Sequence, residues 1–350
     1  MKRRKDGRYE KSIVINGKRN VFYGKTQREV IEKIMQFEEE REAGPLLKEV
    51  IEMWQNKQEK KISYTTMKTY KARLKKIEER FGDQRIRLIT SRSINAYISS
   101  LVECGFSYKT VTGHLSLINM VFRSAVIDGL IETSPAELIR VPSGLTRIAR
   151  ELPSDSDTRK IIESHHLPFG MFAYLILYTG LRKGEALALA YQDIDWSKKE
   201  IHVTKSIYFE NNQPKLKSPK TQRGNRIVPL LDALADVLPK RDIGLIFPGA
   251  DNAHMTASQY EKAWNSFAEK TGISCTAHQL RHSMATILYE AEIPEKDAQE
   301  IMGHADITTT RNIYTHIRNS RKKETSDKLN QFISSSDFRH ISDSADGKAT

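Results

Sequence analysis

Within the first forty residues, the spacing of apolar positions changes from one typical of β-strands to one typical of a helix. Two runs rich in β-branched and aromatic residues, 12–15 and 21–23, flank Asn16-Gly17, a pair that favours a tight hairpin turn. Thr26 and Glu29 then have the spacing of a capping box, and apolar residues follow at helical intervals. This pattern predicts a small sheet followed by one helix, a module with little core of its own.

Four amphipathic segments follow the break at Gly44-Pro45. They span residues 46–54, 66–77, 91–102 and 110–128, and the second of them carries many basic residues. Helical periods of this length indicate a bundle of about four helices, which ends near two prolines, Pro135 and Pro142. The residues after it contain glycine, proline and several charges, a composition typical of a linker.

The remaining residues have the pattern of a mostly helical domain with a small sheet. Residues 171–178 form a buried helix that ends at Thr179-Gly180, and another helix opens directly afterwards. Residues 200–204 and 225–229 have strand patterns and flank a long basic segment, which predicts a hairpin with a cationic arm.

The patterns together predict a multidomain chain that is mainly α with small β-sheets, an α+β fold. A chain of 350 residues is long enough for two or three domains. We expect a three-stranded sheet with one helix in residues 1–43, a helical bundle in 44–142, a linker in 143–156, a mostly helical domain in 157–334 and a polar tail in 335–350.

Charge favours a polyanionic partner, with nucleic acid as the first candidate. The chain has 56 Lys and Arg residues against 44 Asp and Glu, a formal net charge of +12. Residues 1–28 hold ten basic and two acidic residues, a composition that also suits a solvated tail. The candidate DNA-binding residues come from this terminus, from the second helix of the bundle and from the cationic arm: Lys2, Arg3, Arg4, Lys5, Lys68, Lys71, Lys75, Lys215, Lys217 and Arg223.

Other features argue against secretion, a membrane and a metal. The longest apolar run, 171–181, is shorter than a membrane span, and no apolar stretch follows the basic start of the chain. The two cysteines, Cys104 and Cys275, lie outside any disulfide framework or zinc-binding spacing. We therefore expect a cytoplasmic protein without metal or cofactor.

Several weak signals for phosphate chemistry lie between residues 180 and 316. Arg182 stands at a helix junction, where its guanidinium would suit a phosphate, although a salt bridge to Glu185 is the commoner use. His278 and Arg281 lie on one face of a helix, but a core histidine with a surface arginine is more frequent. Gly303 ends a helix, and we expect Thr308 to cap the next one.

Five motifs that occur in a fixed order are much more specific for one protein family than any single motif. They are Gly-Leu-Arg-x-Gly-Glu at 180–185, Pro-Lys-Thr at 219–221, His-x-Leu-Arg-His at 278–282, Gly-His at 303–304 and Ile-Tyr-Thr-His at 313–316. This order resembles the tyrosine recombinase family, in particular the integrases of phages and conjugative transposons. The resemblance covers residues 157–320, and the preceding segments look like the core-binding and arm-binding domains of that family. Met302 and Gln279 depart from the pattern without removing a catalytic group.

The resemblance implies roles for individual residues. Tyr314 would attack the scissile phosphate and form a 3′-phosphotyrosyl bond, with His278 as its proton acceptor. Lys220 would protonate the leaving 5′ oxygen, and Lys217 in the same arm is the alternative. The remaining groups would bind or orient the phosphate: Arg182, Arg281, His278 and His304 as donors and Glu185 as a support. Fixed cationic donors favour this reaction because negative charge grows on the phosphate oxygens.

The implied function is site-specific recombination that integrates and excises a mobile element. The partners would be double-stranded DNA with core and arm sites, further copies of the chain in a tetramer, and an excisionase or host DNA-bending factor. A type IB topoisomerase shares the chemistry but needs no arm module, and a non-catalytic relative would have lost a catalytic position. A chromosome-dimer resolving recombinase would begin near the bundle, so residues 1–43 favour an integrase.

Overall fold

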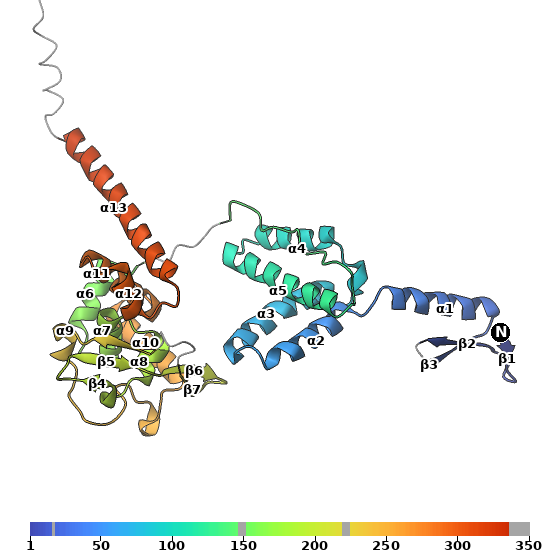
Figure 1. Ribbon diagram of the computed structural model, residues 1–350, viewed down its shortest axis with the longest axis horizontal. Helices are drawn as coiled ribbons and strands as arrows, with labels where there is room; N and C mark the ends of the chain where they lie inside the picture. Colours follow the sequence, from blue (N-terminus) through green and yellow to red (C-terminus); the bar gives the residue numbers. More distant parts are fainter. Residues whose placement is uncertain (16–17, 146–151, 219–224, 336–350) are drawn as a thin grey trace, which may run out of the picture. The chain divides into compact units, whose positions relative to one another are not determined.

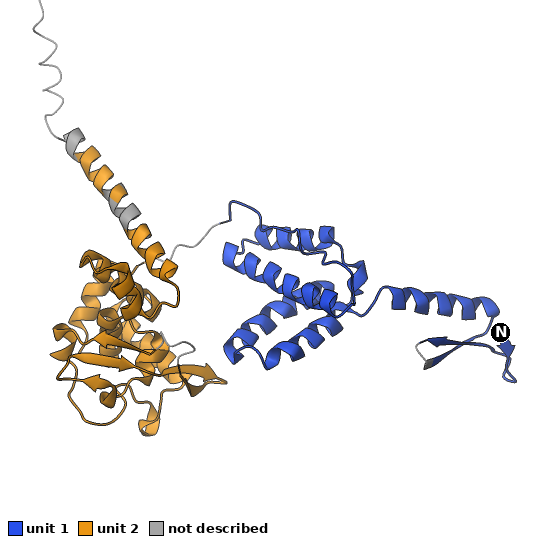
Figure 2. Ribbon diagram, viewed as in Figure 1, with its two compact units in different colours: residues 1–149 blue, residues 150–350 orange. Residues whose placement is uncertain are grey.

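A computed structural model of the chain describes residues 1–15, 18–145, 152–218 and 225–335 (Figure 1). These residues belong to two compact units, residues 1–149 and 150–350 (Figure 2). The division falls within 143–156, where the sequence pattern places a linker; the finer domain boundaries stay predictions. No helix in the described ranges combines the length and the apolar character needed to cross a membrane.

The first unit begins with an antiparallel sheet and a helix, as the hydrophobic pattern predicts. Its strands β1 (Lys2–Arg3), β2 (Tyr9–Ile15) and β3 (Lys18–Gly24) lie in that order and precede α1 (Gln27–Glu42). Phe22 of β3 packs against Phe37 of α1, and Thr26 caps the helix by accepting a hydrogen bond from the backbone N–H of Glu29. The predicted turn residues 16–17 lie outside the described ranges.

The same unit continues as a helical bundle, which confirms the four predicted helices with wider bounds. These are α2 (Leu47–Glu59), α3 (Tyr64–Phe81), α4 (Ser91–Glu103) and α5 (Tyr108–Ile127). Large side chains with almost no exposure form its core, among them Trp54, Phe81, Leu117 and Phe122. This core keeps the basic side chains of α3 at the surface.

The second unit is mostly helical. Its helices are α6 (Asp155–Glu163), α7 (Gly170–Thr179), α8 (Lys183–Ala188), α9 (Asp232–Ala235), α10 (Ala257–Thr271), α11 (Ala277–Glu290), α12 (Glu295–Met302) and α13 (Ile307–Ser335). The apolar helix α7 lies in the centre of the core, and Figure 1 shows α13 extending beyond the rest of the unit. Residues 336–350 of the predicted tail lie outside the described ranges.

In the described part of this unit, five short strands form a sheet and a separate hairpin. Strands β4 (Ile194–Asp195), β5 (Glu200–Val203) and β8 (Arg226–Pro229) form an antiparallel sheet in which the two predicted strands pair, while β6 (Ser206–Glu210) and β7 (Gln213–Lys217) form the hairpin. The expected cationic arm thus contains two strands that the pattern did not resolve. Their turn uses Asn211 and Asn212, both at positive φ, a conformation that asparagine tolerates. Residues 219–224 lie outside the described ranges.

The start of α13 differs from the prediction in its capping residue. Gly303 ends α12 with φ of 62°, as the pattern predicts. The prediction that Thr308 caps the next helix is wrong, because α13 already begins at Ile307 and Thr308 is inside it. Instead, the carboxylate of Asp306 accepts the backbone N–H of Thr308 at 2.9 Å. A carboxylate suits this position because the first N–H groups of a helix lack partners within it.

Candidate active site

Three arginine side chains converge on the C-terminal end of α12. Arg226 donates to the carbonyl oxygen of Ile301 at 2.8 Å, Arg281 to that of Met302, and Arg182 to that of Gly303 at 2.7 Å. The last carbonyls of a helix have no partner within it and carry the negative end of its dipole. The end of α12 therefore orients three guanidinium groups that come from β8, α11 and the junction before α8.

The carboxylate of Glu185 neutralises part of this positive charge. It accepts from the guanidinium of Arg182 at 2.8 Å and from two nitrogens of Arg226 at 3.1 and 2.8 Å. Burial raises the pKa of Glu185, but the hydrogen bond from Arg226 and the charges of Arg226 and Arg182 outweigh it and lower the pKa to about 2. The salt-bridge interpretation of Arg182 is thus correct, yet its side chain remains 45% exposed and can also meet a ligand.

Two motif glycines allow the backbone to approach the arginines. Gly180 has φ of 63°, and a Cβ atom there would lie 2.7 Å from the sulfur of Met302. A Cβ atom at Gly303, which also has positive φ, would lie 2.9 Å from the guanidinium carbon of Arg226. Side chains are excluded at both positions, by conformation and by space.

Helix α11 carries the histidine–arginine motif of residues 278–282. The expectation that favoured a core histidine with a surface arginine is wrong here, because Arg281 is 3% exposed and His278 is exposed. Arg281 also donates to the carbonyl of Gly180. Burial, and then the charge of Arg182, lowers the pKa of Arg281 to about 9, so the guanidinium stays charged at neutral pH.

Gln279, which departs from the family pattern, has a structural role at the start of α11. Its side-chain oxygen accepts the backbone N–H of Thr276 at 2.8 Å, and the Thr276 hydroxyl accepts the backbone N–H of Gln279 at 3.3 Å. This reciprocal pair is a capping box. Next to it, the imidazole of His278 lies 3.2 Å from that of His282 between their Nε2 atoms.

His304 is buried and follows Gly303, whose carbonyl accepts from Arg182. Its Nδ1 lies 2.9 Å from the hydroxyl of Thr310, and its backbone carbonyl accepts from the side chain of Gln299. Burial, followed by the charges of Arg281 and Arg182, lowers the pKa of His304 to about 3. At neutral pH it is a neutral imidazole, which has one N–H to donate.

Tyr314 lies on α13 and is almost buried. Its ring packs edge to face on that of Tyr289, with 5.0 Å between centroids, and its hydroxyl donates to the carbonyl of Ile293 at 3.3 Å. Burial, and then the charge of Glu295, raises the pKa of Tyr314. The phenol is therefore protonated at neutral pH and directed at a backbone carbonyl.

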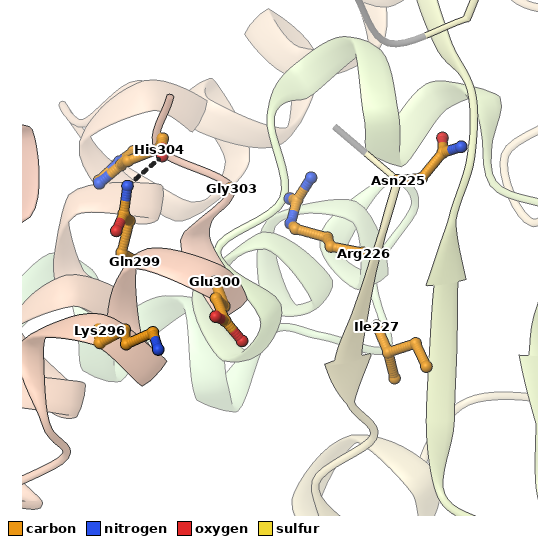
Figure 3. Close-up of a pocket in the computed structure, with 8 residues that line it drawn as sticks. All are labelled: Asn225, Arg226, Ile227, Lys296, Gln299, Glu300, Gly303 and His304. Atoms are coloured by element: carbon orange, nitrogen blue, oxygen red, sulfur yellow. Dashed lines mark hydrogen bonds between the residues drawn. The ribbon is translucent and has the colours of Figure 1, made fainter. Parts of the chain in front are cut away.

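Four of the predicted catalytic side chains line two cavities. One of about 480 Å³ is lined by Arg182, His278 and Arg281 together with Lys183, Lys217 and Tyr260. Another of about 570 Å³ lies between β8 and α12 and is lined by Arg226 and His304, with Asn225 and Lys296 at its sides (Figure 3). Tyr314 lines neither cavity, and Lys220 lies outside the described ranges.

The predicted DNA-binding residues are exposed wherever they are described. Lys68, Lys71 and Lys75 follow each other at intervals of three and four residues on α3 and form one stripe. The predicted DNA-binding residues of the first strand and turn are Lys2, Arg3, Arg4 and Lys5, and those of β7 are Lys215 and Lys217. Arg4 stacks on Tyr23 and binds Glu10 at 3.2 Å, and Arg223 lies outside the described ranges.

Sequence reasoning missed Arg226 as a member of the site. The sequence pattern places it in the strand that ends the basic segment, with no role in the site, but its side chain is 5% exposed. The alternation of side chains along a strand could have identified it. Arg226 and the buried Val228 are two residues apart and face the same side of β8, whereas Ile227 is exposed. An arginine in the buried register of a strand requires an acidic partner.

Comparisons with known proteins identify the family and the fold of the chain. Two family profiles match the chain, "Phage integrase family" over residues 155–321 and "Phage integrase, N-terminal SAM-like domain" over residues 46–102. With the relatives described below, these matches show a tyrosine-type site-specific DNA recombinase. Together the two profiles assign residues 46–102 and 155–321 to the phage integrase family.

Relatives and solved structures support the assignment. A XerC-like tyrosine recombinase of Caldanaerobacter subterraneus subsp. tengcongensis is 28% identical over 74% of this chain and 75% of its own length. The ICEBs1 integrase of Bacillus subtilis is 29% identical over the same shares. The fold is similar to that of the Tn1549 transposon integrase in complex with transposon right end DNA, with a TM-score of 0.64, 21% identity and coverage of 81% of this chain and 99% of the other.

We predict that Glu185→Gln destabilises the second unit at neutral pH by about 3 kcal/mol, because it leaves the buried guanidinium of Arg226 and the partly exposed one of Arg182 without a counter-charge. Since the pKa of Glu185 is lowered on folding, its contribution is present above the pKa of the unfolded chain and decreases as the pH falls from about 4.5 towards 2. The difference in urea midpoint between variant and wild type should therefore narrow below pH 4.5. The exposed Glu269→Gln on α10 is the control, and a difference independent of pH would contradict the prediction.

Proposed function

We propose that the arginine cluster binds the scissile phosphate of DNA during strand cleavage. Three guanidinium groups and one carboxylate have a formal charge of +2, and this excess is the observation that carries the proposal. A phosphodiester has one negative charge and gains further charge on its oxygens as a nucleophile attacks. Arg182 and Arg281 donate to the non-bridging oxygens, and Glu185 with Arg226 keeps Arg182 in position.

Two histidines complete this phosphate site. His304 has its pKa lowered to about 3, so it contributes a hydrogen bond without a further positive charge. His278 lines the same cavity as Arg182 and Arg281. Because its ring is exposed, it is available to accept the proton of an incoming nucleophile.

In the proposed reaction the nucleophile is Tyr314. Its hydroxyl leaves the carbonyl of Ile293 and passes its proton to His278, and its oxygen forms a bond to phosphorus while the bond from phosphorus to the 5′ oxygen breaks. Lys220 gives a proton to the leaving oxygen. The product is a 3′-phosphotyrosyl bond, and a 5′ hydroxyl of another strand reverses the same steps.

Tyr314→Phe should bind core-site DNA like the wild type and form no covalent adduct, because only one hydroxyl is lost. A nicked suicide substrate that traps the phosphotyrosyl bond measures the adduct. Tyr289→Phe is the matched control, since it removes a hydroxyl from the ring that packs on Tyr314. Adduct formation by Tyr314→Phe would assign the nucleophile to another residue.

A DNA substrate with sulfur at the scissile 5′ bridging position identifies the general acid. Lys220→Ala should lose about 10²–10⁴-fold in cleavage rate on normal DNA, the usual effect of general-acid catalysis, and recover most of it on the sulfur substrate. A thiolate leaves without a proton, whereas Arg182→Ala should not be rescued because it acts on the phosphate charge. Lys217 lines the cavity with Arg182, so rescue of Lys217→Ala but not of Lys220→Ala would make Lys217 the acid.

We further propose that the first unit binds DNA at two kinds of site. The stripe of Lys68, Lys71 and Lys75 suits the backbone of a core site, and the basic strand and turn of residues 2–5 suit an arm site. The recombining complex would contain four copies of the chain, with an excisionase or a host DNA-bending factor as a further partner. The mobile element would be of the phage or conjugative-transposon class.

Removal of residues 1–43 should weaken binding to long DNA with arm sites and leave cleavage of a short core site largely intact. Phosphate contacts release counterions, so the truncated protein should also have a shallower salt dependence on long DNA. Truncation removes the contact of Glu40 with Arg85, so the full chain with Lys2, Arg3 and Lys5 changed to Gln is the second arm of the test. Equal salt slopes for all three proteins would mean that the segment does not contact DNA.

A further inference from the structure

Lys183, the residue after Arg182, is held between two aromatic rings. Its ammonium nitrogen lies 4.6 Å from the ring centroid of Tyr260 on α10 and 5.5 Å from that of Phe209 on β6. Lys183 and Tyr260 line the same cavity of about 480 Å³ as Arg182, Arg281 and His278. Lys183 is exposed at the surface, but its ammonium group packs against these two rings and is not a member of the arginine cluster.

The packing around Lys183 fixes the start of its side chain. A Cβ atom at Gly184 would lie 2.2 Å from the carbonyl oxygen of Ile207, so the first turn of α8 is in direct contact with β6. This contact places Lys183 beside Phe209, which is two residues further along β6. The second glycine of the Gly-Leu-Arg-x-Gly-Glu motif thus determines where the lysine side chain begins.

The aromatic contacts hold the ammonium group without removing its charge. An ammonium over an aromatic face is attracted by the electrons of the ring, whereas a carboxylate partner would neutralise it. Partial burial of the Lys183 ammonium group beside the rings lowers its pKa, although the charge of Glu261 on α10 acts in the opposite direction. An anion that enters the cavity would offset the cost of this burial, and the side chain would lose little further freedom because the rings already restrict it.

We propose that Lys183 binds the DNA phosphate that neighbours the scissile phosphate, with Tyr260 and Phe209 holding its ammonium group in place. The inference rests on the proposed role of Arg182 and Arg281 at the scissile phosphate. Consecutive Cα atoms are about 3.8 Å apart, and arginine and lysine have long side chains that can diverge from them to groups several ångströms from one another. Two adjacent residues that line one cavity can therefore reach two successive phosphates.

Single methylphosphonate substitutions test this assignment, because each removes the charge of one phosphate. Wild-type protein should lose roughly tenfold or more in single-turnover cleavage when one particular phosphate next to the scissile one is neutral, the usual effect of a charge-assisted contact. Lys183→Gln should lose a similar factor on normal DNA and become insensitive to that one substitution. Its sensitivity to all other positions should remain that of the wild type.

Matched variants show whether the effect belongs to this lysine and its two rings. Lys198→Gln removes another lysine of the second unit, one that pairs with Asp195 and is 67% exposed, and it should keep the wild-type sensitivity at every phosphate. Phe209→Leu should weaken the dependence on the same phosphate as Lys183→Gln, because one ring is lost while apolar packing remains. Thermal unfolding of each variant confirms that it is folded.

Three outcomes overturn the proposal. Lys183→Gln could keep the wild-type sensitivity at every flanking phosphate, which would leave only a packing role for the lysine. A 5′ bridging sulfur could restore its cleavage rate, which would make Lys183 a proton donor. Phe209→Leu could lower the cleavage rate by the same factor whichever phosphate is made neutral, which would show that the rings have no role at one particular phosphate. Failure of the wild type to form an adduct would instead contradict the proposed reaction.

Discussion

The geometry of the site depends on three consecutive carbonyl groups at the end of α12. Ile301, Met302 and Gly303 each accept a hydrogen bond from one arginine, and those arginines come from three different elements. Without these acceptors, three guanidinium groups in a small volume would repel one another. The dipole of α12 and the carboxylate of Glu185 make the arrangement stable while leaving an excess of positive charge for a phosphate.

This constraint explains why the motifs are short and far apart in the chain. Gly180 and Gly303 have positive φ and lie so close to other groups that a Cβ atom would collide with them. Glu185 must follow Arg182 by three residues so that its carboxylate can accept both the backbone N–H and the guanidinium of that arginine. Each motif is therefore a set of contacts with another motif, and a single motif has little meaning by itself.

The same reasoning shows what the sequence could and could not predict. Helical and strand periods depend on local burial, so they predicted the helices of the bundle and the pairing of β5 with β8. The burial of Arg281 and Arg226 depends on acceptors more than twenty residues away or on other elements, which no local pattern reveals. Asp306 replaced Thr308 as the cap because α13 begins one residue before Thr308, a difference that the hydrophobic period does not resolve.

The arginine cluster and Tyr314, the proposed nucleophile, are held by forces of different strength. Arg281 and Arg226 are buried with charge-assisted hydrogen bonds, each worth more than a neutral one. The hydroxyl of Tyr314 is held by one neutral hydrogen bond to the carbonyl of Ile293, whose net contribution is about 1 kcal/mol. Releasing this hydroxyl therefore costs little, whereas displacing the arginines would expose buried charges, so in the proposed reaction the tyrosine is the part that moves towards a bound phosphate.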